Sequence, residues 1–287
     1  MLNILPMTDS NSLRREILDS YWRSGQSDPC NFRKIRIFTL GDFHILNADG
    51  ASLNLKRFGG KLQALLKILI TSGGQKITKE RVIDALWPDA EGDLGNSTFD
   101  TTLYRLRKKL GIGEIIIVEN GHVSLNQSLC WIDLWELELQ ITELKYLFNK
   151  QDIAHHLLAR KTNTCMQLYR GAFLQKDQDT HWTIICRERI QSRMILMLRQ
   201  LAVYWEQQAA VEQAELILLQ ALDIDPASEI LYVKLVQLYF RNGRSADAAK
   251  LFKKCELILT QVLGVQPSDS FKLLIQNANQ RVRAKVA

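Results

Sequence analysis

The sequence predicts a mainly α-helical protein with a small β part, divided into two domains of different kinds. In residues 31–130, short runs that alternate apolar and polar side chains flank three stretches with the periodicity of an amphipathic helix. From Trp131 to the end, residues 131–287, the pattern is helical throughout and contains an internal repeat. Residues 1–30 hold one short helical stretch, SLRREILDSYW, and are interpreted as an N-terminal arm and linker.

The first domain begins with a small antiparallel meander over residues 35–55, IRIFTLGDFHILNADGASLNL. Its apolar and polar residues alternate over short runs, which is typical of half-buried strands. Gly41-Asp42 and Asp49-Gly50 interrupt these runs where tight turns are expected.

Three predicted helices follow the meander. The first covers residues 61–72, KLQALLKILITS, with leucines at helical spacing. The second begins at Thr78, whose hydroxyl is suited to an N-cap, and ends before Pro88. The third covers residues 96–110 and ends at Gly111, which is suited to the C-terminal cap.

A β-hairpin over residues 114–126, EIIIVENGHVSLN, completes this domain, and Asn120-Gly121 is a strong signal for its turn. Three helices followed by a hairpin is the element order of a winged helix-turn-helix domain. In that fold the second helix supports the third in the major groove of DNA.

The third helix has two dissimilar faces. Its apolar residues fall within one narrow arc of a helical wheel and are expected to face the core: Phe99, Leu103, Leu106 and Leu110. Hydroxyls, a tyrosine and cations occupy the opposite face and its flanks: Ser97, Thr98, Thr101, Tyr104, Arg105 and Lys108. Arg107 lies beside the buried arc, where it reaches a phosphate or pairs with a protein acid. Asp100 is the only acid of this helix and lies laterally.

Cations in the last turn of a helix also complement its dipole, and such clusters are common on solvated faces. A merely solvated face usually mixes both signs of charge, whereas this face is rich in hydroxyls and poor in acids. Hydroxyl groups contact bases or phosphates, arginine suits guanine or phosphate, and lysine attracts phosphate. The composition therefore favours double-stranded DNA as the partner.

The second domain contains tandem helical repeats. Ala214, Leu218, Ala221 and Pro226 follow the A-x3-F-x2-A-x4-P spacing of a tetratricopeptide (TPR) unit. Shifted by one repeat length, the equivalent positions are Leu235, Tyr239, Ala248, Phe252 and Cys255, and Thr260 replaces the proline. We expect Leu218, Ala221, Tyr239, Ala248 and Phe252 to form the core of a TPR-like all-α domain.

Several segments together resemble a known family. The meander, GGKLQALLKILI, RVIDALWPD, LYRLRKKLG and VENGHVSLN resemble an OmpR/PhoB-type winged helix of the version found in SARP/AfsR-type transcriptional activators. LYRGAFLQ, RERI, ALDIDPASE and LYFRNGRSADAAKLF resemble the bacterial transcriptional activator domain that follows it in that family. The resemblance covers residues 35 to about 275, with the pieces in the family's order, and it implies a transcriptional activator.

The resemblance also implies roles for particular residues. Helix 96–110 would be the recognition helix, and the wing tip, which approaches the minor groove, would be Asn120, Gly121 and His122. The loop over residues 88–95 would touch RNA polymerase through the acidic side chains of Asp89, Glu91 and Asp93, although an ordinary solvated loop explains these acids equally well. Two departures matter, because Glu119 stands at a wing tip without Arg or Lys, and Tyr104 stands where relatives often have a small or basic residue.

The sequence argues against an enzyme. The glycine-lysine stretches FGGKLQ and SGGQKIT lack the G-x4-G-K-[ST] spacing of a phosphate-binding loop. His155-His156 has neither an HExxH frame nor a nearby cysteine, so no metal and no cofactor are expected. The five cysteines are far apart, which fits a reducing cytoplasm, and no apolar run is long enough to span a membrane.

Other readings remain open at this stage. The repeats suit dimerisation, signal input or polymerase contact, so a second copy of the chain and RNA polymerase join DNA as candidate partners. A TPR-type protein-interaction adaptor is one alternative to the DNA-binding regulator. Another is an accessory or terminal part of a larger signalling ATPase regulator.

Overall fold

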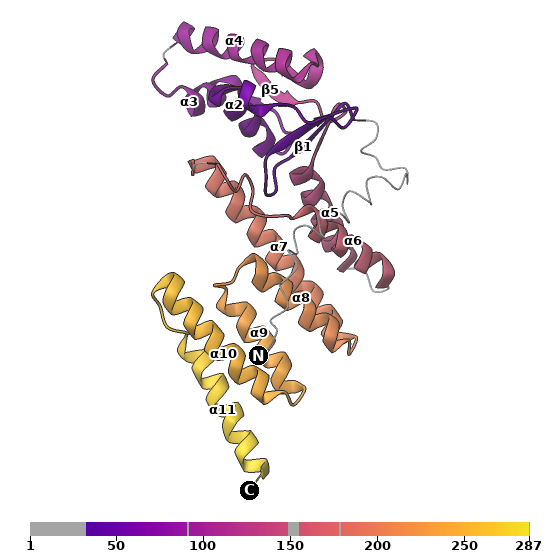
Figure 1. Ribbon diagram of the computed structural model, residues 1–287, viewed down its shortest axis with the longest axis vertical. Coiled ribbons are helices and arrows are strands. Elements are labelled where there is room, and N and C mark those ends of the chain that lie inside the picture. Colours follow the sequence, from indigo (N-terminus) through magenta and orange to yellow (C-terminus); the bar gives the residue numbers. More distant parts are fainter. Residues whose placement is uncertain (1–32, 91, 149–154, 178, 287) are drawn as a thin grey trace, which may run out of the picture. The chain divides into compact units, whose positions relative to one another are not determined.

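The computed structural model describes residues 33–286 apart from Glu91, residues 149–154 and Gln178 (Figure 1). The helix expected within residues 1–30 therefore lies outside the described part. The described chain is mainly helical with a small β part, as the sequence predicts. It divides at Arg187 into two compact units.

The first unit contains a small sheet near its N-terminal end. Strand β1 (Ile35–Phe38) pairs antiparallel with β2 (His44–Asn47) and parallel with β6 (Cys130–Ile132), so the strand order is β2-β1-β6. Residues 51–55 of the predicted meander add only a single bridge to β2. Ile37, in the middle of the central strand, is completely buried.

The three predicted helices are present as α2 (Gly60–Thr71), α3 (Lys79–Leu86) and α4 (Gly92–Leu110). Thr78 caps α3 as expected, because its hydroxyl accepts a hydrogen bond from a main-chain amide of the first turn. Gly111 follows α4 with a φ of 73°, the left-handed conformation that ends a helix. Both α2 and α3 pack against α4.

The predicted loop over residues 88–95 is shorter than expected, because α4 begins at Gly92. The reason lies in the packing of α4 on α3. A Cβ atom at Gly95 would stand 2.9 Å from the Ile83 side chain, so a glycine within the helix permits this close approach. The expectation that Gly95 is a loop residue is therefore wrong, since Gly95 lies within α4 and serves its packing on α3.

The hairpin has the predicted turn. Strands β4 (Ile116–Glu119) and β5 (His122–Leu125) pair antiparallel, and Asn120 and Gly121 between them both have positive φ angles. An additional short strand, β3 (Ile77–Thr78), which the sequence pattern does not predict, pairs with β5 and gives the order β3-β5-β4.

The rest of the first unit begins with α5 (Asp133–Phe148) and α6 (His155–Leu168), which pack against each other. The chain then returns to the end of β1, where residues 172–174 pair with residues 39–41. Helix α7 (His181–Gln207) starts in this unit.

The second unit contains α7 from Glu188 onwards and then four helices: α8 (Val211–Ile224), α9 (Glu229–Arg241), α10 (Ser245–Ile258) and α11 (Asp269–Val286). From α8 onwards each helix packs against the next, with a π-helical turn after α10. The repeat spacing therefore corresponds to consecutive helix pairs, as in TPR-like folds.

Four of the five expected core residues of this unit are buried: Leu218, Ala221, Tyr239 and Ala248. The expectation for Phe252 is wrong, since its side chain is only half-buried. Its ring packs edge-on against Phe271 of α11, with 5.0 Å between the ring centroids, instead of being enclosed between two repeats.

Candidate nucleic-acid interface

Helix α4 presents one face to the core and leaves another uncovered. Its buried side chains are Phe99, Thr102, Leu103, Leu106 and Leu110. Its exposed residues from Asn96 onwards are Asn96, Ser97, Asp100, Thr101, Tyr104, Arg105, Lys108 and Lys109. Thr98 lies at the boundary and is half-buried. Tyr104 is 66% exposed, an unusually large value for an aromatic side chain that contributes nothing to the core.

The acid on this face is neutralised from a neighbouring helix. Lys79 Nζ, at the start of α3, lies 2.9 Å from Asp100 Oδ1 and 5.0 Å from the centre of the Phe99 ring. The Lys79 side chain is only 17% exposed, whereas that of Asp100 is 64% exposed. The outer face of α4 therefore carries its cations without an uncompensated acid between Asn96 and Leu110.

Arg107 has a different role from its neighbours. It is half-buried, and its Nη2 donates a hydrogen bond of 2.6 Å to the carbonyl of Ile116 on β4. Its Nε is buried and has no hydrogen-bond partner among the described residues. The guanidinium thus ties α4 to the hairpin. Its partner is a main-chain carbonyl, not the phosphate or the protein acid that the sequence suggests.

The tip of the hairpin is held close to the start of α3. Asn120 and Gly121 are exposed, and the Gly121 carbonyl accepts a 2.8 Å hydrogen bond from the Lys79 amide. The half-buried His122 ring contacts the Asn120 carbonyl through Nδ1 at 3.0 Å. The hairpin tip and α4 are therefore linked through Lys79, which contacts both.

Lys76 offsets the acid near the hairpin tip. Its Nζ lies 2.7 Å from Glu119 Oε2, and this hydrogen bond and charge lower the pKa of the Glu119 carboxyl. Sequence patterns do not point to Lys76, because it precedes β3, a strand of two residues that is too short to show alternation. The lysine itself, directly before Ile77, was the available signal.

The acidic residues expected to face polymerase are not brought together by an observed contact. Asp89 is exposed after α3, and Asp93 is exposed in the first turn of α4. A negative charge in that turn also complements the dipole of α4. Glu91 lies outside the described residues.

Within the described part of the chain, no group of three or more His, Cys, Asp or Glu side chains is arranged to hold a metal ion. His155 and His156 are both exposed at the start of α6. Cys130, Cys165 and Cys186 are buried as free thiols, as is Cys255. No described helix combines the length and the apolar character needed to cross a membrane.

Comparisons with known proteins add a family to this geometry. The family model described as "Bacterial transcriptional activator domain" matches residues 132–278. No curated protein sequence matches the chain. Among solved structures, Mycobacterium tuberculosis EmbR in complex with a low-affinity phosphopeptide has a similar fold, with a TM-score of 0.63 at 16% sequence identity. The match covers 87% of this chain and 66% of that chain, slightly less than two thirds of its length. Since the family model matches half of the residues of this chain, the chain belongs to the bacterial transcriptional activator domain family.

Proposed function

We propose that the chain is a SARP-type transcriptional activator that binds double-stranded DNA sequence-specifically through α4. In this proposal residues 31–130 form an OmpR/PhoB-type winged helix-turn-helix domain, with α4 as recognition helix and Asn120, Gly121 and His122 as the wing tip. Residues 131–287 form the activator domain. DNA binding by residues 31–130 and membership of residues 132–278 in a transcriptional activator family would both serve the regulation of transcription.

The observation that carries the proposal is the outer face of α4. An α-helix fits the major groove of B-DNA, and side chains on its outer face then reach base edges and phosphates. Thr101 and Tyr104 are suited to base edges, and Arg105 and Lys108 to guanine or phosphate. The pairing of Asp100 with Lys79 removes the charge that would repel the phosphates.

The hairpin fits the same arrangement. Arg107 fastens α4 to β4, and the Lys79 amide fastens the hairpin tip to α3, so both contacting elements have fixed positions. Because the tip lacks an exposed cation of its own and Glu119 is paired with Lys76, we expect its DNA contacts to be made by main-chain groups and by His122.

The helical second unit would serve dimerisation, signal input or contact with RNA polymerase, which such repeat surfaces commonly provide. For the polymerase we propose the acidic residues Asp89, Glu91 and Asp93 as contact candidates. Their charge would complement a basic protein surface.

A binding measurement on the full chain tests the proposal. Fluorescence anisotropy would compare duplexes enriched from a randomised pool with scrambled duplexes of equal length, at several salt concentrations. We expect the enriched duplexes to bind on the order of 10³-fold more tightly than the scrambled ones. Equal affinity for both would contradict sequence-specific binding and would favour the protein-interaction adaptor.

A further inference from the structure

The chain after α6 forms a strap, residues 172–177, across the end of β1. The Gly41 amide donates to the Ala172 carbonyl at 3.1 Å, and the Leu174 amide donates to the Thr39 carbonyl at 2.8 Å. The Thr39 amide itself donates to the buried carboxylate of Asp133, at the start of α5. The main chain at the end of β1 is thus fully paired only when both the strap and α5 are in place.

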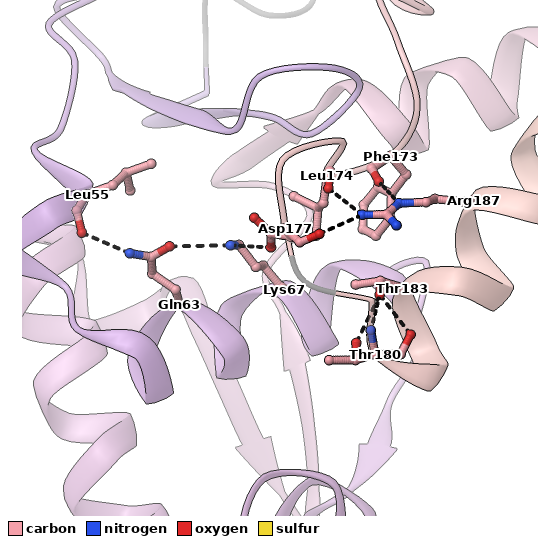
Figure 2. Close-up of polar contacts among 9 residues, drawn as sticks. All are labelled: Leu55, Gln63, Lys67, Phe173, Leu174, Asp177, Thr180, Thr183 and Arg187. Atoms are coloured by element: carbon pink, nitrogen blue, oxygen red, sulfur yellow. Dashed lines mark hydrogen bonds and ion pairs between the residues drawn. The ribbon is translucent and has the colours of Figure 1, made fainter. Parts of the chain in front are cut away.

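A partly buried ion pair joins the strap to α2. Asp177 Oδ2 lies 2.5 Å from Lys67 Nζ, and the Lys67 side chain is 8% exposed (Figure 2). Gln63 Oε1 accepts from the same ammonium at 3.3 Å, and the Phe43 ring lies 4.5 Å from it. A buried charge that loses its partner is strongly destabilising, so α2 depends on the position of Asp177.

Arg187, in the second turn of α7, holds the strap from its other side. Its Nε donates to the Phe173 carbonyl at 2.7 Å, and its Nη2 donates to the carbonyls of Leu174 at 2.6 Å and Asp177 at 3.2 Å (Figure 2). One guanidinium therefore binds three main-chain carbonyls of a six-residue segment. Charged donors make the stronger kind of hydrogen bond.

From these contacts we infer that the strap couples the start of α7 to α2. Displacing Arg187 releases the strap, which frees the end of β1 and withdraws Asp177 from Lys67. Because α2 packs against α4, the release reaches the helix of the candidate DNA interface. Only this last step rests on the proposed function, since the coupling between α7 and α2 is a property of the fold itself.

Hydrogen–deuterium exchange on the full chain tests the coupling, with the change at one end of the strap and the readout at the other. In Arg187→Met we expect the Gly41 amide and the α2 amides to exchange about tenfold faster, since a hydrogen bond to a charged group changes an opening equilibrium by roughly this factor. Lys176→Met is the matched control. Lys176 also belongs to the strap, but its side chain is 80% exposed and pairs with Asp42 at the surface. We expect it to change exchange by less than about twofold.

Faster exchange confined to the strap and α7, with α2 unchanged, would overturn the coupling. Should Arg187→Met fail to fold, Asp177→Asn reports the same coupling in reverse, because coupling between two sites is reciprocal. It removes the charge next to Lys67 at nearly constant volume. We then expect faster exchange of the Ile184 amide in the first turn of α7, and an unchanged Ile184 amide would overturn the inference.

DNA affinity tests the step from α2 to the candidate DNA interface separately from the coupling between α7 and α2. We expect Arg187→Met to weaken binding of an enriched duplex by at least about fivefold relative to Lys176→Met. Unchanged affinity together with faster α2 exchange would contradict the step from α2 to the DNA interface. If the wild-type chain binds no duplex specifically, the proposed function fails, and the exchange data still decide the coupling.

Discussion

Lys79 and Asp100 form a contact between α3 and α4 that sets the charge of the candidate DNA interface, with 2.9 Å between Nζ and Oδ1. The carboxylate is largely exposed and would repel phosphates if it were alone. Lys79 also donates its amide to the hairpin tip through the Gly121 carbonyl. One residue thus neutralises the acid on the outer face of α4 and holds the hairpin tip in position.

Removing the acid should strengthen DNA binding. Asp100→Asn leaves the Lys79 ammonium free for a phosphate, so we expect affinity to rise several-fold at low salt and the gain to shrink as salt screens it. Glu80→Gln is the control, because Glu80 is an exposed acid on α3 outside the α4 face. Equal effects of the two substitutions in an anisotropy titration would show that only net charge matters.

The salt dependence of binding should distinguish the cations of α4. Arg105→Ala and Lys108→Ala should each lower the slope of log K against log salt by roughly 1, since each would remove one phosphate contact. Lys250→Ala, an exposed lysine on α10, should leave the slope unchanged. An unaltered slope in both α4 variants would remove the support for phosphate contacts by this helix.

Arg107→Ala should lower the stability of the fold and leave the slope of log K against log salt unchanged. Its guanidinium donates to the Ile116 carbonyl and is half-buried, so its removal leaves a main-chain acceptor unpaired. We expect the free energy of unfolding to fall by about 1–3 kcal/mol. A changed salt slope with unchanged unfolding would assign Arg107 to the phosphates.

The repeat core should reject a larger side chain. Ala248 is completely buried in α10, so Ala248→Leu should overpack its surroundings and cost about 1–3 kcal/mol in chemical denaturation. Ala246→Leu lies on the exposed side of the same helix and should change stability by less than about 0.5 kcal/mol. Similar losses for both would mean that Ala248 is not a tight contact.

Stability should depend on pH through His44. Burial lowers the pKa of this imidazole below 6.5, and the nearby Arg170 charge lowers it further, while the Asp42 carbonyl opposes the shift. As the pH falls, His44 of the unfolded chain therefore takes up its proton at a higher pH than His44 of the folded chain. Stability is therefore complete above pH 6.5 and declines as the pH falls towards the lowered value. His44→Phe keeps a ring that can stack on Phe38. In this variant the thermal unfolding midpoint should change less between pH 5 and 7 than in the wild type, and an equal change in both would contradict this prediction.

Much of the fold could be predicted from local patterns. The Asn120-Gly121 turn, the Thr78 cap and the Gly111 stop were each readable, because a specific backbone conformation demands those residues. The buried arc of α4 followed from its periodicity. The prediction that Gly95 lies in a loop was wrong. Its role depends on the contact between α4 and α3, which no local sequence pattern records.

Long-range contacts account for most of what the sequence did not reveal. Residues 172–174 pair with residues 39–41 far earlier in the chain, and Lys67 is buried only because Asp177 meets it there. At the candidate interface, the exposed side chains were predictable from the helical wheel. The partners of Arg107 and Asp100 were not, since both lie on other elements.

The most direct test of the central claim is the DNA sequence selected by a single tyrosine variant. Tyr104 on α4 and Tyr146 on α5 are 66% and 64% exposed, so Tyr104→Ala and Tyr146→Ala remove equally exposed rings from two helices. We predict that the wild-type chain enriches a defined sequence from a randomised duplex pool. Tyr104→Ala should alter the preference at one position, at a cost of about 1–3 kcal/mol for the wild-type base pair, and Tyr146→Ala should select the wild-type sequence. Identical selected sequences for wild type and Tyr104→Ala, or no enrichment by the wild-type chain, would contradict the account.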